Sequence, residues 1–273
     1  MSFSEKGKQT FIEKYGPWAV VTGASSGIGK ALAEEIAAIG LNLILVARRG
    51  KVLEGLADHL RQNQDVEVKV VAADLGTPEG LEAVRIISQT VEVGLFIPAA
   101  GFGTSGEFIF SSVEEEVNML QVNCTAMLAQ THVFARRFAD QGRGGIILFS
   151  SLVAFQGVPF AANYAATKAY VQTFAEGLGI ELQETGVDVL AAAPGPVNSG
   201  FGGRANMQMG KAMKPEQVAF PILYALGKRR TVFPGFMTKF LTGSLSLLPR
   251  WGKVRVMRLV MGGFTAHQRT NIR

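Results

Sequence analysis

The feature that most constrains the fold is a glycine-rich turn, Thr22–Gly29, which separates a short apolar run from a helical pattern. The run before it, Trp18–Thr22, has the length and composition of a buried strand. A second apolar run, Leu41–Val46, follows the helical pattern. That pattern consists of the apolar residues Ile28, Leu32, Ile36 and Ile39, and Gly40 ends it where a C-terminal cap would lie. Strand, glycine turn, helix and strand in this order predict a βαβ unit and a parallel sheet.

Short apolar runs and longer helical stretches continue to alternate up to about residue 197. The helical stretches are expected at Val113–Ala139 and Phe160–Glu184. The chain has 273 residues, 48% of them hydrophobic, so it can bury a sizeable core. Further strands are expected at Val66–Ala72, Leu95–Ile97, Gly145–Ser150 and Val187–Ala193. We therefore predict an α/β fold with a Rossmann-like, doubly wound parallel sheet in a single domain.

Cysteine usage and the N-terminal stretch argue against several classes of protein. Cys124 is the sole cysteine, so an internal disulfide is impossible, and the three histidines show no metal-ligand spacing. Met1–Lys14 is polar and lacks the apolar centre of a signal peptide, and no run approaches the roughly 18 apolar residues that span a bilayer. We expect a cytoplasmic protein with no metal and no membrane-spanning segment.

Basic residues are concentrated at the C-terminal end of the chain. The net charge is +5, but no acidic residue follows Glu216, whereas ten basic residues do: Lys228, Arg229, Arg230, Lys239, Arg250, Lys253, Arg255, Arg258, Arg269 and Arg273. This asymmetry points to peripheral contact with an anionic membrane, with a solvated tail or an oligomer contact as alternatives; we expect no nucleic-acid partner. On a helical wheel of residues 250–262 the charges scatter around the axis, which weakens the case for an interfacial helix.

The glycine turn has the chemistry of a nucleotide-binding loop. Glycines let backbone amides approach a pyrophosphate, which then lies at the positive end of the following helix. Gly23, Gly27 and Gly29 do not follow the G-x-G-x-x-G spacing, so a plain tight turn is an alternative. Their place between a strand and a helix favours the nucleotide.

Two arginines, Arg48 and Arg49, follow the second predicted strand, with no acidic residue between Asn42 and Lys51. This position normally distinguishes a free ribose hydroxyl from a 2′-phosphate. Because guanidinium suits phosphate, the pair favours NADP(H) over NAD(H), and an exposed basic turn is the alternative.

Tyr164 and Lys168 are four residues apart in the second helical stretch, so they share one helix face. A Lys ammonium there would lower the pKa of the Tyr phenol, which could then give a proton to a carbonyl oxygen. On its own such a pair is usually a solvated surface pair. Here it follows the glycine turn and the pair Ser150–Ser151, an order that favours a nucleotide-dependent redox enzyme.

Together these motifs resemble the short-chain dehydrogenase/reductase family over roughly residues 15–201. Tyr15–Arg49 is similar to the hydroxysteroid and 3-oxoacyl reductases, whereas Gly101–Thr104 and Arg143–Phe201 are similar to bacterial oxidoreductases. The resemblance implies the catalytic residues Asn123, Ser151, Tyr164 and Lys168. It also implies a cofactor site made of Gly23, Ser25, Ser26, Gly27, Ile28, Gly29, Arg48, Arg49, Asp74, Ala100, Gly101, Asn123, Tyr164, Lys168, Pro194, Gly195, Val197 and Ser199.

The resemblance further implies a role for each catalytic residue. Tyr164 would supply the proton, while Lys168 would lower its pKa and hold the nicotinamide ribose. Ser151 would hydrogen-bond the substrate carbonyl, and Asn123 would anchor a water of the proton relay. Asp74 would contact the adenine.

One segment departs from the family pattern. Where the family usually has Asn-Asn-Ala-Gly after the fourth strand, this chain has Pro98-Ala99-Ala100-Gly101. Pro98 removes a backbone donor, and the two amide side chains that brace the sheet near the adenine ribose are gone. We expect either weaker cofactor binding or another residue in the bracing role.

Aromatic and methionine side chains are frequent in the segments expected to flank Tyr164. Ligand pockets are dominated by such adaptable apolar side chains, so a lipophilic ketone or aldehyde, or its alcohol, is the predicted substrate. An ordinary core position or a dimer contact is the alternative for each residue. The set comprises Phe102, Phe108, Phe110, Phe155, Phe160, Phe201, Met207, Met209 and Met213.

The sequence thus predicts an NADPH-dependent carbonyl reductase or alcohol dehydrogenase. The alternative is a catalytically weak NADP-binding regulatory or scaffold protein, at a membrane surface or elsewhere. By analogy with the family, the two long helices would pair subunits in a homodimer or homotetramer. We expect an N-terminal extension at 1–14, the catalytic domain at 15–230 with a substrate loop at about 195–215, and a basic, apolar C-terminal extension at 231–273 packed on or flanking that domain.

Overall fold

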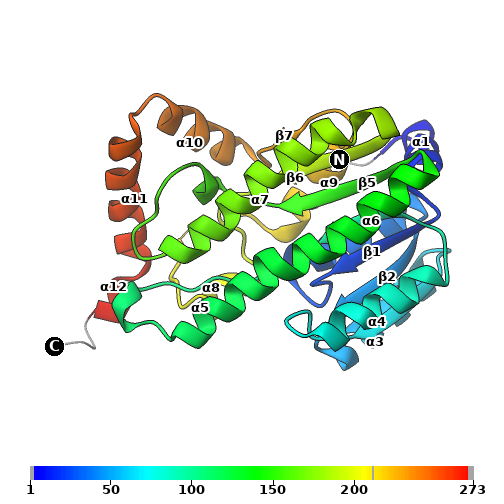
Figure 1. Ribbon diagram of the computed structural model, residues 1–273, viewed down its shortest axis with the longest axis horizontal. Coiled ribbons are helices and arrows are strands. Elements are labelled where there is room, and N and C mark those ends of the chain that lie inside the picture. Colours follow the sequence, from blue (N-terminus) through cyan, green and yellow to red (C-terminus); the bar gives the residue numbers. More distant parts are fainter. Residues whose placement is uncertain (1–2, 211, 270–273) are drawn as a thin grey trace.

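The computed structural model describes residues 3–210 and 212–269, so Arg273 of the basic segment lies outside it. Within these residues, seven parallel strands form one sheet in the order β3-β2-β1-β4-β5-β6-β7 (Figure 1). The strands are β1 Trp18–Thr22, β2 Asn42–Ala47, β3 Val68–Ala72, β4 Val93–Pro98, β5 Gly144–Phe149, β6 Val187–Ala192 and β7 Thr231–Val232. The order runs outward in both directions from β1 and β4, which confirms the predicted doubly wound α/β fold.

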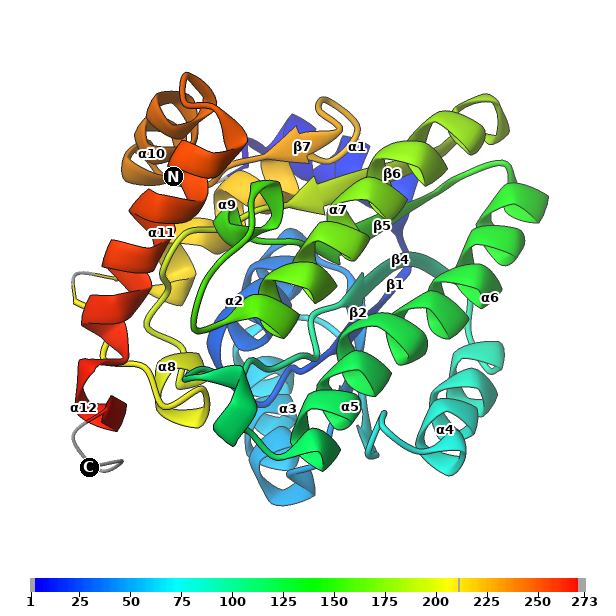
Figure 2. The ribbon, with the colours of Figure 1, turned by 60° about the vertical axis from the view of Figure 1, so that its left-hand side comes forward.

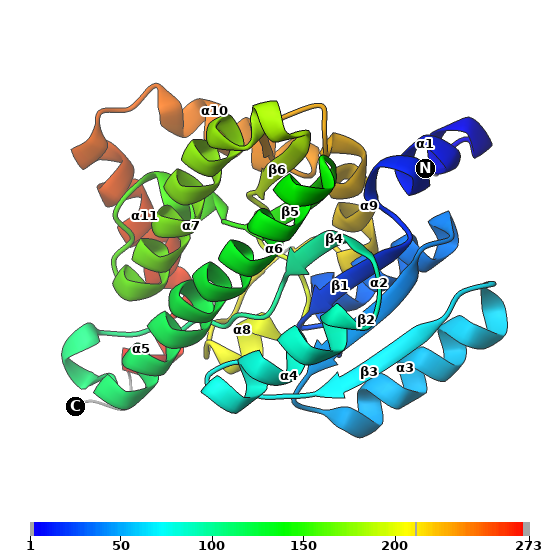
Figure 3. The ribbon, with the colours of Figure 1, turned by 45° about the vertical axis from the view of Figure 1, so that its right-hand side comes forward.

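Helices cover both faces of the sheet (Figure 3). Side chains of α1, α2, α3 and α9 belong to the core on one face, and those of α4, α6 and α7 to the core on the other. The helices are α1 Glu5–Tyr15, α2 Gly27–Ile39, α3 Gly50–Asn63, α4 Pro78–Gln89, α5 Val113–Leu120, α6 Met127–Gln141, α7 Ala162–Glu181, α8 Phe201–Arg204, α9 Pro215–Ala225, α10 Phe236–Ser246, α11 Arg250–Phe264 and α12 Ala266–Arg269. Both sheet faces are therefore buried, as the unbroken apolar runs of the central strands require.

The first long helical stretch differs from its prediction in the middle. Helices α5 and α6 are joined by a π-helical segment, Gln121–Ala126, instead of continuing as one regular α-helix. Strand β7 was also missed, because two residues are too short to show a period. The other predicted strands are found, with ends that shift by at most two residues.

The first and the last described helices, α1 and α12, lie at opposite ends of the sheet (Figure 1). Helix α1 packs at the amino ends, where the Tyr15 hydroxyl donates a hydrogen bond to Asp188 at the start of β6, with 2.6 Å between the oxygens. Helices α10 and α11 lie beyond the carboxyl ends of the strands, and the lower part of α11 passes near α8 (Figure 2). In the described part of the chain, no helix has both the length and the hydropathy needed to cross a membrane.

Candidate active site

A cavity of about 1200 Å³ lies at the carboxyl ends of the strands, where doubly wound sheets bind their ligands. Small-ligand pockets usually occupy roughly 300–1000 Å³, so this cavity has room for more than one molecule. All the predicted cofactor residues line it except Asn123. One part of its wall comes from the glycine turn and the ends of β2 and β3, and we call this the nucleotide part. A second, apolar part comes from α8, α10 and α11.

The glycine turn is tightly packed at the carboxyl end of β1. Gly23 has a positive φ of +66°, and a Cβ atom there would lie 2.8 Å from the backbone of Ala99 and Ala100. A Cβ at Gly29 would lie 2.5 Å from the Gly23 carbonyl oxygen. Among the described residues, no side-chain hydrogen bond from Ser26 caps the start of α2. The first amides of α2 thus remain for an anion, which fits a pyrophosphate.

Two guanidinium groups stand next to this turn. Arg49 donates from Nη2 to the Ser25 hydroxyl oxygen at 3.0 Å and to the Ser25 carbonyl oxygen at 3.2 Å. Arg48 is more than half exposed, and its Nη1 lies 3.8 Å from Asp74 Oδ2. Asp74 also accepts a hydrogen bond from the Gly76 amide at 3.0 Å. Arg49 therefore stiffens the turn, while Arg48 keeps donors free for a phosphate.

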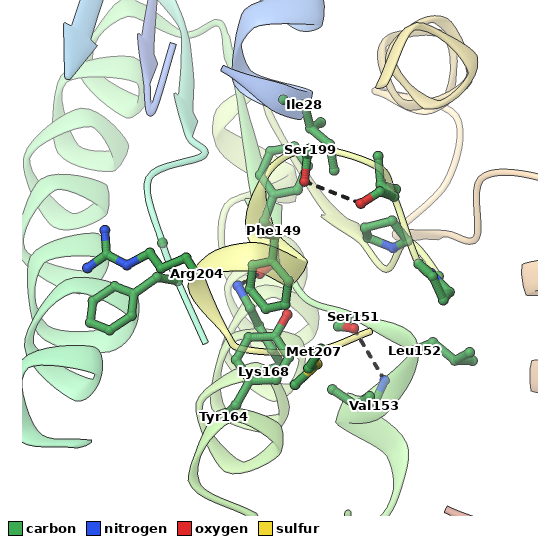
Figure 4. Close-up of a pocket in the computed structure, with 18 of the residues that line it drawn as sticks. Ile28, Phe149, Ser151, Leu152, Val153, Tyr164, Lys168, Ser199, Arg204 and Met207 are labelled. Carbon is green, nitrogen blue, oxygen red and sulfur yellow. Dashed lines mark hydrogen bonds between the residues drawn. The ribbon is translucent and has the colours of Figure 1, made fainter. Parts of the chain in front are cut away.

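A third guanidinium, Arg204 of α8, also lines the cavity and was not predicted. Its guanidinium carbon lies 4.0 Å from the centroid of the Phe102 ring, an attractive cation–π contact (Figure 4). Burial and the positive charge of Arg48 lower the pKa of Arg204. No motif marks Arg204, because only the folded chain brings α8 near the end of β2.

Thr22 provides a brace at the position where the chain departs from the family pattern. Its buried hydroxyl accepts a hydrogen bond from the Ala100 amide at 3.0 Å. Pro98 lies opposite Thr22 in the parallel ladder between β1 and β4. The segment after β4 is therefore tied to β1 through a threonine side chain.

Asn123 lies in the π-helical segment and does not line the cavity. Its amide donates to the Phe102 carbonyl oxygen at 2.8 Å and to Thr167 Oγ1 at 3.2 Å, and its Oδ1 accepts from the Phe102 amide at 3.1 Å. These bonds connect the loop after β4 to α7. Single π-helical turns are frequent at functional sites, and here the turn directs Asn123 toward this loop. Its water-anchoring role stays a prediction.

Ser151, Tyr164 and Lys168 come together at the cavity wall (Figure 4). Ser151 follows β5, and its hydroxyl accepts a hydrogen bond from the Val153 amide at 3.4 Å. Tyr164 and Lys168 project from the same face of α7, with the Lys168 Nζ 5.8 Å from the Tyr164 ring centroid. The Lys168 ammonium donates to the Phe149 carbonyl oxygen at 2.8 Å. The structure thus assembles the three residues that the sequence places in separate segments.

The pKa of Tyr164 differs from its prediction. Burial raises the pKa of Tyr164 to about 12, and its hydrogen bond with Ser151 lowers it by a smaller amount. Burial also lowers the pKa of Lys168 to about 8. The predicted net lowering of the Tyr164 pKa is not found, because desolvation raises it and the Lys168 ammonium donates to a carbonyl oxygen instead of the phenol. The phenol is consequently protonated at neutral pH.

The segment after β6 closes another side of the cavity. The Pro194 carbonyl accepts from the Leu152 amide at 3.0 Å, and the Asn198 amide donates to the Met213 carbonyl at 2.8 Å. A Cβ at Gly195 would lie 2.8 Å from the hydroxyl oxygen of Thr238 on α10. The absence of a side chain at Gly195 thus lets α10 pack directly on this segment.

The predicted apolar lining is found in part. Phe108 and Phe160 border a separate hollow, Phe110 is exposed, Phe155 packs on Phe233 and Met213 packs on the main core. These five residues do not line the cavity. The predicted residues that do line the cavity are Phe102, Phe201, Met207 and Met209.

Most of the apolar wall comes from α10 and α11, which the sequence analysis did not assign to the site. Their buried side chains Leu245, Met257 and Met261 form one cluster with Ala161 and Ala165 near the start of α7. The apolar spacing of α11 was an available signal, because Val256 and Val260, like Met257 and Met261, are four residues apart. The main contributors are Leu241, Leu245, Met257, Val260, Met261 and Phe264.

Hydrogen bonds fasten the end of this C-terminal segment to the domain. Gln268 donates to the Ser105 hydroxyl at 2.9 Å and to the Asn206 carbonyl at 2.5 Å. The Gln208 amide donates to the Phe264 carbonyl at 2.9 Å. The loop that carries Asn206 and Gln208 is therefore joined to the C-terminal helices.

The family model for short chain dehydrogenases matches residues 17–210. The chain belongs to this family. Among curated relatives, the 7beta-hydroxysteroid dehydrogenase of Collinsella aerofaciens is 33% identical over 234 residues, which cover 83% of this chain and 89% of the relative. The family and this relative make the chain an oxidoreductase.

Solved structures of short-chain dehydrogenases agree with this assignment. A structure of a 7beta-hydroxysteroid dehydrogenase is 30% identical and superposes with a TM-score of 0.84, covering 90% of this chain and 98% of the other. A short-chain dehydrogenase from Sphingobium yanoikuyae in complex with NADPH is 31% identical, with a TM-score of 0.77 and coverage of 86% and 97%. The cofactor of the chain described in this structure is therefore of the NAD(P) type, and its substrate is a small molecule.

Proposed function

We propose that the protein is an NADPH-dependent carbonyl reductase, or alcohol dehydrogenase in the reverse direction, that acts on a lipophilic ketone or aldehyde. The observation that carries the proposal is the position of Ser151, Tyr164 and Lys168, which line one cavity together with the glycine turn and the apolar wall. Reduction of a carbonyl needs a hydride and a proton, and a bound nicotinamide supplies the hydride.

The chain's own residues would supply the proton and orient the carbonyl. The Tyr164 phenol is protonated at neutral pH, so it can donate its proton to the carbonyl oxygen. The Ser151 hydroxyl can donate a second hydrogen bond to the same oxygen. The Lys168 ammonium then stabilises the phenolate that remains. Asn123 would act indirectly, by holding the loop after β4 and anchoring a water.

Several features of the nucleotide part support NADPH as the cofactor. The exposed donors of Arg48 suit a 2′-phosphate, and Arg204 adds a second positive charge to the same cavity. The uncapped start of α2 suits the pyrophosphate. Asp74 would contact the adenine, and the segment Pro194–Ser199 would line the nicotinamide. One similar structure, from Sphingobium yanoikuyae, is a complex with NADPH.

The apolar part of the cavity supports a lipophilic substrate. Its wall consists mainly of Leu, Met, Val and Phe side chains, with few polar groups beyond Ser151 and Tyr164. Methionines such as Met207 and Met257 adapt to rings and chains of varied shape. A relative of this chain carries the name 7beta-hydroxysteroid dehydrogenase.

A thermal-shift assay combined with a turnover assay tests this proposal. NADPH should raise the melting temperature more than NADH at equal concentration, because only a ligand of the folded state stabilises it. NADPH consumption should then appear with lipophilic ketones and not with acetone. Tight NADPH binding without turnover on a wide carbonyl panel would favour the scaffold function instead, and no shift with either nucleotide would contradict both.

The proposal includes a homodimer or homotetramer that pairs through the long helices. The outer faces of α5, α6 and α7 expose apolar side chains at Val113, Val117, Leu120, Leu128 and Tyr170. Exposed apolar side chains in such number are typical of an interface. Sedimentation velocity of the purified chain measures the assembly, and a monomer at micromolar concentration would contradict this part of the proposal.

A further inference from the structure

Helices α10 and α11 are apolar on two sides. Their inner sides line the cavity, yet their outer sides also carry large apolar residues that no described part of the chain covers. Leu247 is 86% exposed, Phe236 82%, Leu259 79% and Trp251 64%. Phe236, Phe240 and Leu247 follow one face of α10, and the two phenylalanine rings stack with 6.5 Å between centroids. Soluble chains seldom expose so many large apolar groups without a partner.

Arginines lie among these apolar groups. Trp251, Arg255, Arg258 and Leu259 are spaced i, i+4, i+7 and i+8, so they share one exposed face of α11. The Arg255 guanidinium carbon lies 5.0 Å from the Trp251 ring. Lys253, one of the four charges that scatter on the helical wheel, is half-buried. We call Phe236, Phe240, Leu247, Trp251, Arg255, Arg258 and Leu259 the α10–α11 surface.

The charge of this surface discriminates between possible occupants. A second copy docked by two-fold symmetry would bring the surface against itself and place the arginines of both copies in one contact. No acidic residue follows Glu216, so α10 and α11 themselves offer no counter-charge to such a contact, and Glu107, which borders the same hollow as Arg258, is one nearby carboxylate. An anionic bilayer instead offers phosphates to the arginines and hydrocarbon to the phenylalanines and leucines. Trp and Arg are side chains typical of the lipid–water interface.

We propose that the α10–α11 surface docks the protein onto an anionic lipid bilayer. The apolar side chains of Phe236, Leu247 and Trp251 enter the acyl boundary, while Arg255 and Arg258 contact the headgroups. The same helices line the cavity through Leu241, Leu245 and Met257. Docking therefore places the apolar part of the cavity next to the bilayer, where a lipophilic substrate is concentrated. Access to a concentrated lipophilic substrate rests on the proposed function, whereas docking itself does not.

Vesicle flotation with the full chain tests the charged part of the surface. The protein should float with phosphatidylcholine vesicles that contain phosphatidylserine, and float less without phosphatidylserine or at high salt. Arg255→Glu/Arg258→Glu should weaken binding at least about tenfold. Lys6→Glu/Arg229→Glu is the matched control, because it changes the net charge equally at exposed positions outside this surface and should leave binding unchanged.

Tryptophan fluorescence tests the apolar part. The chain has two tryptophans, and Trp18 is only 7% exposed, so an external quencher should reach Trp251 alone. Brominated phosphatidylcholine mixed with phosphatidylserine should quench the wild-type emission on binding. Trp251→Phe keeps an apolar side chain, so it should still float while the quenching disappears.

These outcomes are independent of turnover, so failure of docking and failure of the proposed function are distinguishable. Equal flotation of Arg255→Glu/Arg258→Glu and wild type would overturn the proposal, as would absence of wild-type flotation. If wild type does not float and the arginine variant changes the sedimentation coefficient, the surface is a contact between copies of the chain. Circular dichroism of each variant confirms that it folds.

Discussion

The nucleotide part of the cavity is formed by backbone and polar side chains at the ends of strands, whereas its apolar part is formed by side chains on α8, α10 and α11. The first lies within the stretch matched by the short-chain dehydrogenase model, residues 17–210, and α10 and α11 lie outside it. Backbone geometry at strand ends leaves few choices for the residues there. A wall of packed apolar side chains can be built from many different combinations of residues. We infer that cofactor binding resides in the first part and substrate choice in the second, and that Ser151, Tyr164 and Lys168 act where the two parts meet.

The largest expected effect concerns the catalytic group, where the two parts of the cavity meet. Tyr164→Phe removes the phenolic proton but keeps the ring, so kcat should fall about 100- to 10,000-fold. NADPH affinity and the melting temperature should change little. Steady-state kinetics on one lipophilic ketone measures the loss. Near wild-type turnover would refute the tyrosine mechanism.

Cofactor choice should depend on the arginines after β2. Arg48→Ala/Arg49→Ala removes two guanidinium donors, so the Kd for NADPH should rise about 10- to 100-fold. The Kd for NADH should stay nearly constant, since it has no 2′-phosphate, and it serves as the internal control. Both constants are measurable by titration calorimetry. Equal losses for the two nucleotides would mean that the pair only stiffens the turn through Ser25.

The pH profile should reflect Lys168, whose pKa burial lowers to about 8. Its ammonium is present below that pH and lost above it, so the rate of carbonyl reduction should fall roughly tenfold for each pH unit above about 8. Tyr164 stays protonated through this range and adds no inflection. Lys168→Arg keeps its charge, so its profile should be flat to pH 9. A flat wild-type profile would show that this charge is not needed.

Two leucines on the C-terminal helices allow the inner and the outer sides to be tested separately. Leu241 lines the cavity, whereas Leu259 is exposed on the outer side. Leu241→Ala should raise KM for a lipophilic ketone about fivefold and leave NADPH affinity unchanged. Leu259→Ala is the matched control, and with substrate in detergent-free buffer its KM should equal that of wild type. Similar KM values for both variants would remove α10 from the substrate site.

The smallest effect concerns the brace at the border of the nucleotide part. Thr22→Val removes the acceptor of the buried Ala100 amide, so the free energy of unfolding should fall by about 1–3 kcal/mol. Urea denaturation measures the difference. Ser26→Ala, at an exposed position of the same turn, is the control for a change in hydroxyl content. Unchanged stability of Thr22→Val would mean that another group satisfies the Ala100 amide.

The sequence alone predicted a parallel sheet, its doubly wound arrangement and nearly all residues of the nucleotide part. These features are local: an apolar run forms a strand, and the glycine turn directly follows β1 in the chain. Tyr164 and Lys168 could be paired because four residues make one helical turn. Asn123 was recognised as well, although the π-helical segment that positions it has no pattern distinct from an ordinary helix.

Tertiary structure alone decided the rest. The apolar wall joins α10 and α11 to α7, and the Thr22 hydroxyl meets the Ala100 amide across 78 positions of chain. The pKa of Tyr164 depends on how deeply the phenol is buried, and Arg204 reaches the cavity only when α8 folds over it. Periodicity and spacing report which residues are neighbours along one element. They do not report which elements meet, because that depends on how the whole chain buries its apolar surface.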